Sequence, residues 1–284
     1  MQSEDPVVFL NGTFVPRSQA SISVMDRGFL FGDGIYEVIP AYGGRLFRLE
    51  EHLDRLDNSL NAIRLESPYR REKWREIMER LLDGTGDQSI YLQITRGVAA
   101  KRDHAFPVSS DPTVFAMCSP IQPISDGRTG VRAITSQDTR WTRCDIKATT
   151  LLANILLRQE AVDQGCAEAI LIRDGQVTEG AASNVFAVID GVLQTPPKGN
   201  DILPGITRDL ILELADADGI PATENAIAAE TLKSADEIWL TSSTREILPV
   251  VELDGRKIAD GLPGPVWQRM YSLLQDFKRS LQTS

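Results

Sequence analysis

The chain has 284 residues, with 30 lysines and arginines against 40 aspartates and glutamates, and a formal net charge of -10. This acidity argues against a partner such as nucleic acid or an anionic membrane, because binding phosphates depends on cationic side chains. The 3 cysteines contain no Cys-x-x-Cys pair and there are only 2 histidines, so neither a disulfide framework nor a metal site is expected. Without a signal-like or membrane-spanning apolar run, the sequence predicts a cytoplasmic protein with small-molecule partners.

The first half of the chain predicts an α+β domain. Asn11-Gly12 stands between two β-prone runs and predicts a hairpin. A second strand pair turns at Gly43-Gly44, and apolar spacing predicts helices over 49–65 and 71–82, followed by a strand over 89–97. Prolines and glycines in residues 119–130 predict a linker, which divides the chain into domains 1–120 and 121–284.

The second half predicts further hairpins and helices around candidate binding loops. Hairpins are expected at Asp174-Gly175 and Asp190-Gly191. A helix is expected after Lys147, with its apolar residues at helical spacing: Leu151, Leu152, Ile155, Leu156 and Val162. Strands and helices do not alternate strictly and no Gly-x-Gly-x-x-Gly occurs, which argues against a Rossmann fold.

Each candidate functional group has an ordinary structural alternative. Lys147, in a strand-to-helix connection, is either a solvated surface lysine or a nucleophile. The amides that follow Gly205 either bind an anion or merely start a helix, and the hydroxyl-rich loop 241–244 is either an anion nest or a turn. Arg55 lies off the apolar stripe of its helix, where it is either solvated or paired with a phosphate.

Seven motifs taken together resemble one family. They are "DRGFLFGDGIYEV" (residues 26–38), "HLDRL", "YLQITRG", "RCDIK", "VTEGAASNVF", "ILPGITRD" and "TSSTREILPV". Their content and order resemble the fold-type IV pyridoxal-phosphate enzymes, which include branched-chain aminotransferases, D-amino-acid aminotransferases and aminodeoxychorismate lyases. The resemblance implies a two-domain α/β (α+β) fold. Its small N-terminal domain is α+β, and its larger C-terminal domain has a barrel-like sheet and helices.

The resemblance implies that the cofactor is pyridoxal 5'-phosphate. Lys147 is then the Schiff-base lysine, and Glu179 is the partner of the pyridine nitrogen. Because Glu179 would tune the ring rather than fill a core, it is expected to matter more to chemistry than to folding. The remaining cofactor contacts implied are Arg55, Gly205, the amides of Ile206 and Thr207, and Ser242-Ser243 for the phosphate, with Leu203 near the ring.

The resemblance also implies a substrate site. Tyr36, Arg102 and His104 match the residues that hold the substrate α-carboxylate in D-amino-acid aminotransferases. The loop is one residue longer than the family pattern, which leaves Lys101 and Arg102 as candidates for the inward cation. The expected reaction is transamination between a D-amino acid, such as D-alanine or D-glutamate, and a 2-oxo acid, pyruvate or 2-oxoglutarate. A homodimer is implied, because the loop serves the neighbouring subunit's site.

Three alternatives stay open at the level of the sequence. Two belong to the same family, namely a branched-chain L-amino-acid aminotransferase and an aminodeoxychorismate lyase. Arg102 with His104 argues against both of them. The third is of a different class: a non-catalytic protein that binds a phosphate ligand on the same fold.

Overall fold

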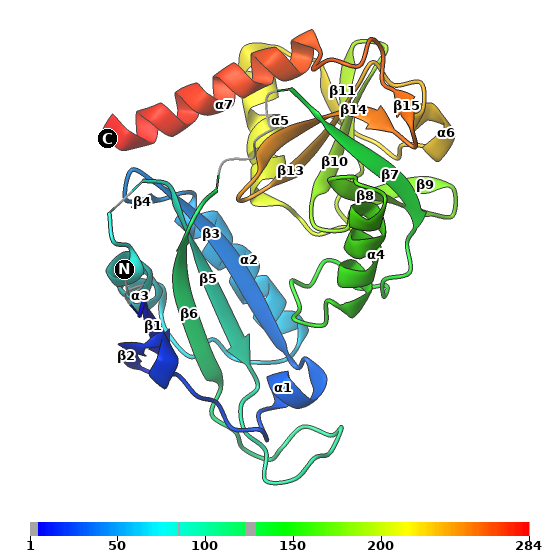
Figure 1. The fold of residues 1–284 in the computed structure, drawn as a ribbon. Coiled ribbons are helices and arrows are strands. Elements are labelled where there is room, and N and C mark those ends of the chain that lie inside the picture. The colour runs from blue at the N-terminus through cyan, green and yellow to red at the C-terminus, as the bar shows by residue number, and fades with distance from the viewer. Residues whose placement is uncertain (1–4, 85, 123–128, 284) are drawn as a thin grey trace. The chain divides into compact units, whose positions relative to one another are not determined.

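The computed structural model describes residues 5–84, 86–122 and 129–283. Its packing divides the chain into two units (Figure 1). One is Met1–Ile121 with Ile146–Thr150, and the other is Gln122–Asp145 with Leu151–Ser284. The mixed α/β class expected from the sequence is confirmed. The division into domains at residue 120 stays a prediction, but residues 146–150, which were assigned to the second domain, pack with the first unit.

The first unit contains an antiparallel six-stranded sheet in the order β2-β1-β6-β5-β3-β4. The strands are β1 (Val7–Leu10), β2 (Thr13–Pro16), β3 (Gly34–Tyr42), β4 (Arg45–Leu46), β5 (Gln88–Thr95) and β6 (Thr113–Pro120). The hairpin expected at Asn11-Gly12 joins β1 and β2, and both turn residues have positive φ, 47° and 94°. The strand pair expected at Gly43-Gly44 is β3 with β4. The sequence therefore specified these two turns by the residue types that tolerate left-handed backbone.

Helices supply the other half of the first unit's core. They are the 3-10 helix η1 (Arg17–Gln19), α1 (Arg27–Phe31), α2 (Leu49–Ala62) and α3 (Arg71–Leu81). Leu53, Leu56 and Leu60 of α2 are almost fully buried, as are Trp74 and Met78 of α3. Their spacing of three and four residues places them on one face of each helix. The sheet residues in the same core include Phe9, Ile35, Ile39, Ile90, Leu92 and Ile94.

The second unit contains a nine-stranded mixed sheet that curls into part of a barrel. Its order is β12-β11-β10-β13-β14-β7-β8-β9, and β15 pairs with β14. The strands are β7 (Val131–Gln137), β8 (Glu168–Arg173), β9 (Gln176–Gly180), β10 (Asn184–Ile189), β11 (Val192–Thr195), β12 (Ala222–Glu224), β13 (Glu237–Ser242), β14 (Glu246–Leu253) and β15 (Arg256–Lys257). The hairpins expected at Asp174-Gly175 and Asp190-Gly191 are both present. Asp174 and Asp190 have φ values of 51° and 50°.

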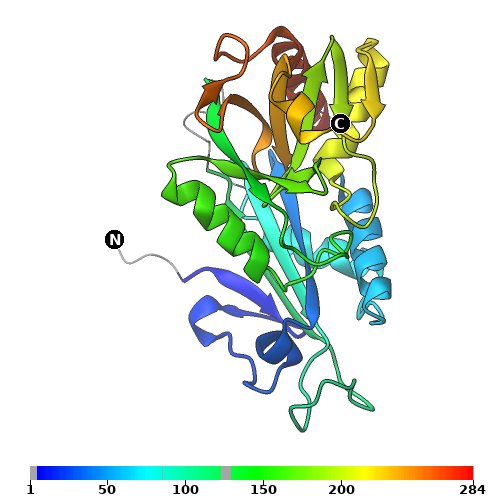
Figure 2. The ribbon, with the colours of Figure 1, turned by 90° about the vertical axis from the view of Figure 1, so that its right-hand side faces the viewer.

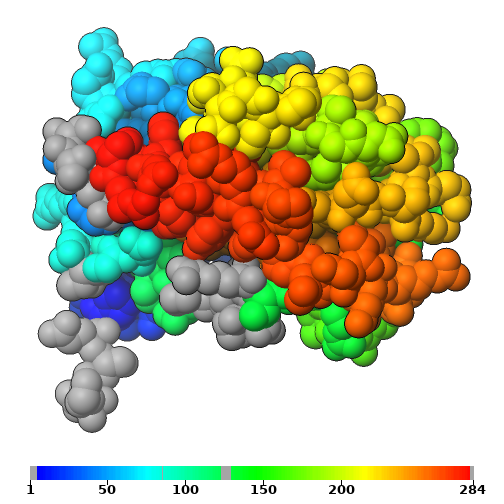
Figure 3. All heavy atoms as spheres, turned by 90° about the horizontal axis from the view of Figure 1, so that it is seen from above, coloured from blue at the N-terminus to red at the C-terminus, as the bar shows by residue number. Residues whose placement is uncertain are grey.

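The helices of the second unit are α4 (Leu152–Asp163), α5 (Ile206–Asp218), α6 (Ala229–Leu232) and α7 (Pro265–Thr283). Figure 3 shows α7 along the surface beside α5, and Arg269 Nε of α7 donates to Asp218 Oδ2 at 2.8 Å. Across the three described ranges, no helix has both the length and the apolar character needed to cross a membrane.

Helix α4 differs from expectation in what its apolar residues do. The helix forms, but Leu152, Ile155 and Leu156 are 70%, 60% and 63% exposed. Leu157 and Ala161 are the residues that α4 buries, and the helix lies against β8 of the same unit (Figure 2). The apolar periodicity therefore marked an outward face of the helix rather than its core face.

The linker expected over 119–130 is only partly described. Residues 123–128 lie outside the described residues. Strand β6 continues through Pro120, so the start of the expected linker is part of the sheet. Proline is tolerated there because it ends the strand.

Candidate active site

The backbone of Lys147 is held in the first unit by hydrogen bonds to β3. The amide of Tyr36 donates to the Lys147 carbonyl at 2.9 Å, and the amide of Thr149 donates to the Gly34 carbonyl at 3.0 Å. The Lys147 amide donates to Ser59 Oγ of α2 at 3.3 Å. Residues 146–150 thus run beside β3 like a short extra strand, which fixes the position of the half-buried lysine.

The side chain of Lys147 lies against the ring of Tyr36. Its Nζ is 4.3 Å from the centroid of the Tyr36 ring, a cation–π distance. Tyr36 in turn stacks on Tyr91 of β5, with 5.8 Å between ring centroids. Burial, with a smaller contribution from Tyr36, raises the pKa of Tyr91 to about 12. The Tyr91 ring therefore stays neutral at physiological pH.

Arg55 is buried in a cluster of charged groups rather than solvated. Its Nε and Nη2 each donate to a different oxygen of Glu37 at 2.8 Å, and Nδ1 of His52 lies 2.8 Å from Glu37 Oε2. All three side chains are less than a tenth exposed. The solvated alternative for Arg55 is therefore wrong, and its guanidinium has a fixed orientation.

The pKa values of this cluster follow from burial and charge. Burial alone would raise the pKa of Glu37, but Arg55 and His52 outweigh it and hold that pKa far below its usual range. Burial lowers the pKa of His52, the bond to Glu37 opposes this, and the cations Arg55 and Lys147 lower it further. His52 is therefore neutral near pH 7, and its Nδ1–H can donate to the ionised Glu37.

The residues expected to hold a substrate carboxylate fall into two places. Tyr36 lies beside Lys147, whereas Arg102 and His104 lie in the exposed loop after β5 and share a contact with Phe31. The guanidinium carbon of Arg102 is 4.9 Å from the centroid of the Phe31 ring, and the His104 ring is 5.3 Å from it. Lys101 is instead 80% exposed and pairs with Asp103 at 2.8 Å. Arg102, rather than Lys101, thus shares the Phe31 contact with His104.

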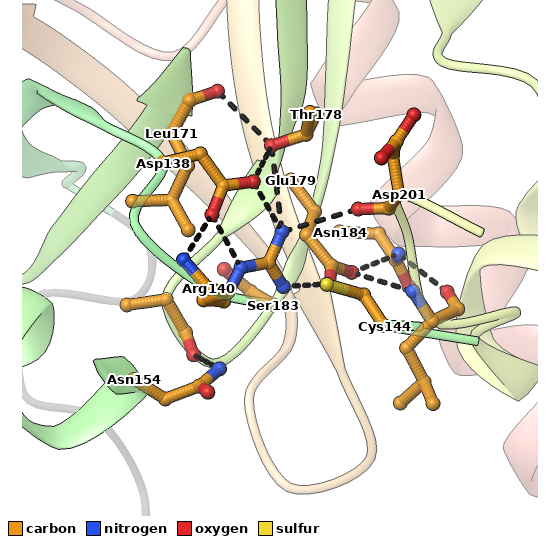
Figure 4. A network of polar contacts seen from close by, with 12 residues as sticks. Asp138, Arg140, Cys144, Asn154, Leu171, Thr178, Glu179, Ser183, Asn184 and Asp201 are labelled. Carbon is orange, nitrogen blue, oxygen red and sulfur yellow. Dashed lines mark hydrogen bonds and ion pairs between the residues drawn. The ribbon is translucent and has the colours of Figure 1, made fainter. Parts of the chain in front are cut away.

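Glu179 is the next-to-last residue of β9 in the second unit and is 5% exposed (Figure 4). Its Oε2 accepts hydrogen bonds from the Leu203 amide and from Asn184 Nδ2, both at 3.0 Å. Its Oε1 forms an ion pair with Arg140 Nη1. Leu203 therefore contributes its backbone to this site, and its carbonyl accepts from Asn184 Nδ2 at 2.8 Å.

The sequence reasoning missed Arg140. This arginine donates to both oxygens of Asp138 at 2.9 Å, through Nε and Nη2. Burial would raise the pKa of Asp138, but the bonds and charge of Arg140 lower it. The only local signal was the Asp-x-Arg spacing, because Glu179 is 39 residues away in sequence.

The anion-site candidates of the second unit lie at the start of α5 and the end of β13. Gly205 is the N-cap of α5, no side chain caps this helix, and its first residues are Ile206 and Thr207. A Cβ on Gly205 would lie 2.0 Å from Asn184 Oδ1, so any other residue there would displace the Asn184 side chain. Uncapped amides at a helix start are a suitable site for an anion.

The hydroxyl-rich loop begins at the end of β13. Thr241 is 1% exposed, and its Oγ1 has no hydrogen-bond partner among the described residues. Ser242 Oγ accepts from the Arg245 amide at 3.3 Å, and Ser243 follows in the turn. A buried hydroxyl without a partner is costly, so Thr241 fits a site that an added ligand would complete.

Comparison of the amino-acid sequence with known protein families identifies the class of protein. Residues 34–253 match the amino-transferase class IV family, and the chain belongs to this family, as predicted. It is 43% identical over 280 residues to a D-alanine aminotransferase of Staphylococcus epidermidis. The aligned region covers 97% of this chain and 98% of the relative.

Solved structures give the same class. The branched-chain amino acid aminotransferase of Escherichia coli is 28% identical, with a TM-score of 0.88 and coverage of 94% of this chain and 93% of that one. A hypothetical aminotransferase from Mycobacterium tuberculosis, solved in a PLP-bound form, is 26% identical, with a TM-score of 0.84 and coverage of 95% and 97%. The fold-type IV architecture implied by the motifs is thus confirmed.

The contacts of Glu179 change what is expected of its substitution. Glu179→Gln removes the charge that pairs with buried Arg140, so we expect a loss of about 1–3 kcal/mol of folding free energy. This should appear as a thermal unfolding midpoint lower by roughly 2–5 °C. The matched control is Glu230→Gln, because the Glu230 side chain is 84% exposed and pairs with Lys233. If both variants melt together, the buried contacts of Glu179 do not stabilise the fold.

Proposed function

We propose that this chain is a pyridoxal-phosphate-dependent aminotransferase that moves the amino group of a D-amino acid to a 2-oxo acid. The donors are of the D-alanine or D-glutamate type, and the acceptors are pyruvate or 2-oxoglutarate. The observation that carries the proposal is the similarity to a D-alanine aminotransferase over 97% of the chain. Arg102 with His104 in one loop supports it, because a guanidinium fork and an imidazole suit a carboxylate.

Glu179 and Lys147 are the two residues proposed to act on the reacting part of the cofactor and the substrate. The cofactor, when bound, supplies an electron sink for the substrate Cα. Glu179 holds the proton of the ring nitrogen, a role that its fixed, ion-paired carboxylate suits. Lys147 would hold the cofactor covalently, and its amine would move the proton at the substrate Cα.

The phosphate is proposed to bind to fixed donors. Arg55 is oriented by its two hydrogen bonds to Glu37, so little side-chain freedom is lost on binding. The amides of Ile206 and Thr207 begin α5 without a side-chain cap. Ser242-Ser243 completes the proposed set, beside the unpartnered Thr241 hydroxyl in the part of the chain that the structure describes.

The working form is proposed to be a homodimer. The exposed apolar face of α4, formed by Leu152, Ile155 and Leu156, is the kind of surface that a second copy covers. The loop that carries Arg102 and His104 would then serve the partner's site. The cytoplasmic location stays a prediction.

A branched-chain L-amino-acid aminotransferase is the second candidate. The observation in its favour is the TM-score of 0.88 to the E. coli branched-chain enzyme, at 28% identity. Enzymes of one fold differ in substrate through side chains and loops, so backbone similarity does not decide between D- and L-amino acids as substrates.

The role of Lys147 predicts where the cofactor becomes attached. Purified protein should be yellow, and borohydride should fix the cofactor irreversibly to the peptide that contains Lys147. Lys147→Ala should lose this attachment, whereas the control Lys101→Ala should keep it. Recovery of the label on another lysine by peptide mass spectrometry would overturn the assignment.

The dimer predicts that two inactive chains can restore each other. A Lys147→Ala chain mixed with an Arg102→Ala chain forms some hybrid dimers in which one site retains both native residues. We expect partial recovery of D-alanine transamination, up to about a quarter of wild type if subunits pair at random. No recovery after mass spectrometry has demonstrated subunit exchange would place Arg102 in its own subunit's site or outside the site.

The hand of the substrate is the direct test of the proposed function. Lys147 can deliver a proton from one side only, so the side that receives the carboxylate decides the configuration. D-alanine should react and L-leucine should hardly react. Arg102→Ala should lower kcat/KM for D-alanine by about 10- to 100-fold, the cost of a charge-assisted contact.

The control for this test is a simple amine, which carries no carboxylate. Its kcat/KM should fall much less in Arg102→Ala than that of D-alanine. Preference of the wild type for L-leucine would favour the branched-chain alternative. Equal losses for D-alanine and the amine in Arg102→Ala would remove the carboxylate role of Arg102.

A further inference from the structure

The loop that carries Arg102 and His104 is bound by a buried arginine from another part of the first unit. Arg27, at the start of α1, is 3% exposed. Its Nη1 donates to the carbonyls of Asp103 at 2.6 Å and Ala105 at 3.2 Å, and its Nη2 donates to the carbonyl of His104 at 3.3 Å. Three consecutive backbone carbonyls therefore converge on one guanidinium.

The same arginine also holds the base of the loop. Its amide donates to the Gly97 carbonyl at 2.9 Å. Gly97 has a φ of +86°, and a Cβ there would lie 1.8 Å from the Asp111 carbonyl oxygen. Only glycine allows the two ends of the loop to approach this closely, so the loop begins and ends at a fixed point.

A carboxylate connects Arg27 to a second arginine. Asp33 Oδ2 accepts from Arg27 Nε at 2.7 Å and from Arg96 Nε at 2.9 Å, and Asp33 Oδ1 accepts from Arg96 Nη2 at 3.0 Å. Burial would raise the pKa of Asp33, but the two arginines lower it. The carboxylate is therefore ionised and fixes the plane of both guanidinium groups.

Ring contacts hold the loop on each side of His104. The guanidinium carbon of Arg96 is 3.7 Å from the centroid of the Phe106 ring. On the other side, the Phe31 ring contacts Arg102 and His104 and lies 4.9 Å from the guanidinium carbon of Arg27. The loop is exposed to solvent, yet its anchors are buried or stacked.

We infer that Arg27 is a positioning residue for the substrate carboxylate. The inference rests on the proposed function, because Arg102 and His104 are the groups that it would orient. By fixing the backbone of residues 103–105, Arg27 orders this part of the loop before substrate arrives, so less conformational freedom is lost on binding. Lysine cannot replace it, because one ammonium group cannot bind Asp33 and three carbonyls in the geometry of a planar fork.

The test compares Arg27→Lys, Arg102→Ala, the double variant and Arg71→Lys in the loaded enzyme. Arg71 is the matched control, since it also binds several oxygens, on Glu50, Asp54 and Asp57, but lies on α3 away from the loop. For each protein, KM and kcat for D-alanine are measured. The inhibition constant of propionate, a carboxylate without an amino group, and the deuterium exchange of loop amides 98–112 are measured as well.

The expected result is selective. Arg27→Lys should raise KM for D-alanine and the propionate inhibition constant by about 10-fold each, with kcat within about twofold, because only carboxylate binding is loosened. Loop amides should exchange faster, and Arg71→Lys should match the wild type in every measurement. The double variant should bind D-alanine no worse than Arg102→Ala, because residues that act through one group are not additive.

Other results separate this inference from the proposed function. One such result is that Arg102→Ala weakens propionate binding while Arg27→Lys changes neither the propionate inhibition constant nor the exchange of the loop amides. That result overturns the role of Arg27 and leaves the carboxylate site standing. Additive losses in the double variant, or a loss in kcat alone, would make Arg27 a merely structural residue. If Arg102→Ala leaves propionate and D-alanine unchanged, the proposed carboxylate site itself is wrong, whatever the loop exchange shows.

Discussion

The hydrogen bonds between residues 146–150 and β3 determine where Lys147, the lysine proposed to react, is held. A lysine in a free connection could sample many positions, but the Lys147 carbonyl and the Thr149 amide are both bonded to β3. The sheet of the first unit therefore carries Lys147, although the segments that flank residues 146–150 belong to the second unit. A catalytic amine requires this kind of backbone constraint, because proton transfer depends on a fixed distance to the reacting carbon.

The alternation of β3 then assigns different tasks to adjacent residues. Tyr36 lies against Lys147, and the next residue, Glu37, points to the opposite face and binds His52 and Arg55 of α2. Arg55 and the neutral His52 both bind the buried Glu37 carboxylate, and these contacts offset the cost of burying its charge. One strand thus orients both the amine and the arginine proposed for the phosphate.

Local chemistry was readable from the sequence, and distant pairing was not. Asn11, Asp174 and Asp190 predicted their hairpins because these residue types accept a positive φ. The partner of Arg55 is 18 residues away and that of Glu179 is 39 residues away, so the seven motifs supplied the family but neither ion pair. Periodicity likewise showed that α4 has an apolar face, but not what covers it. That face is exposed in the single chain, and a proposed second copy would make the pattern a property of the assembly.

The backbone does not decide which hand of amino acid the enzyme accepts. A structure named for branched-chain amino acids aligns at a TM-score of 0.88, while a relative named for D-alanine is 43% identical. The difference must then lie in a few side chains and in how firmly they are held. A loop that carries Arg102 and His104 is exposed, and an unanchored loop would lose conformational entropy whenever a substrate bound. The buried Arg27 and Arg96, joined by the partly buried Asp33, remove much of that loss in advance. The choice between D- and L-amino acids therefore depends on how firmly the loop is anchored.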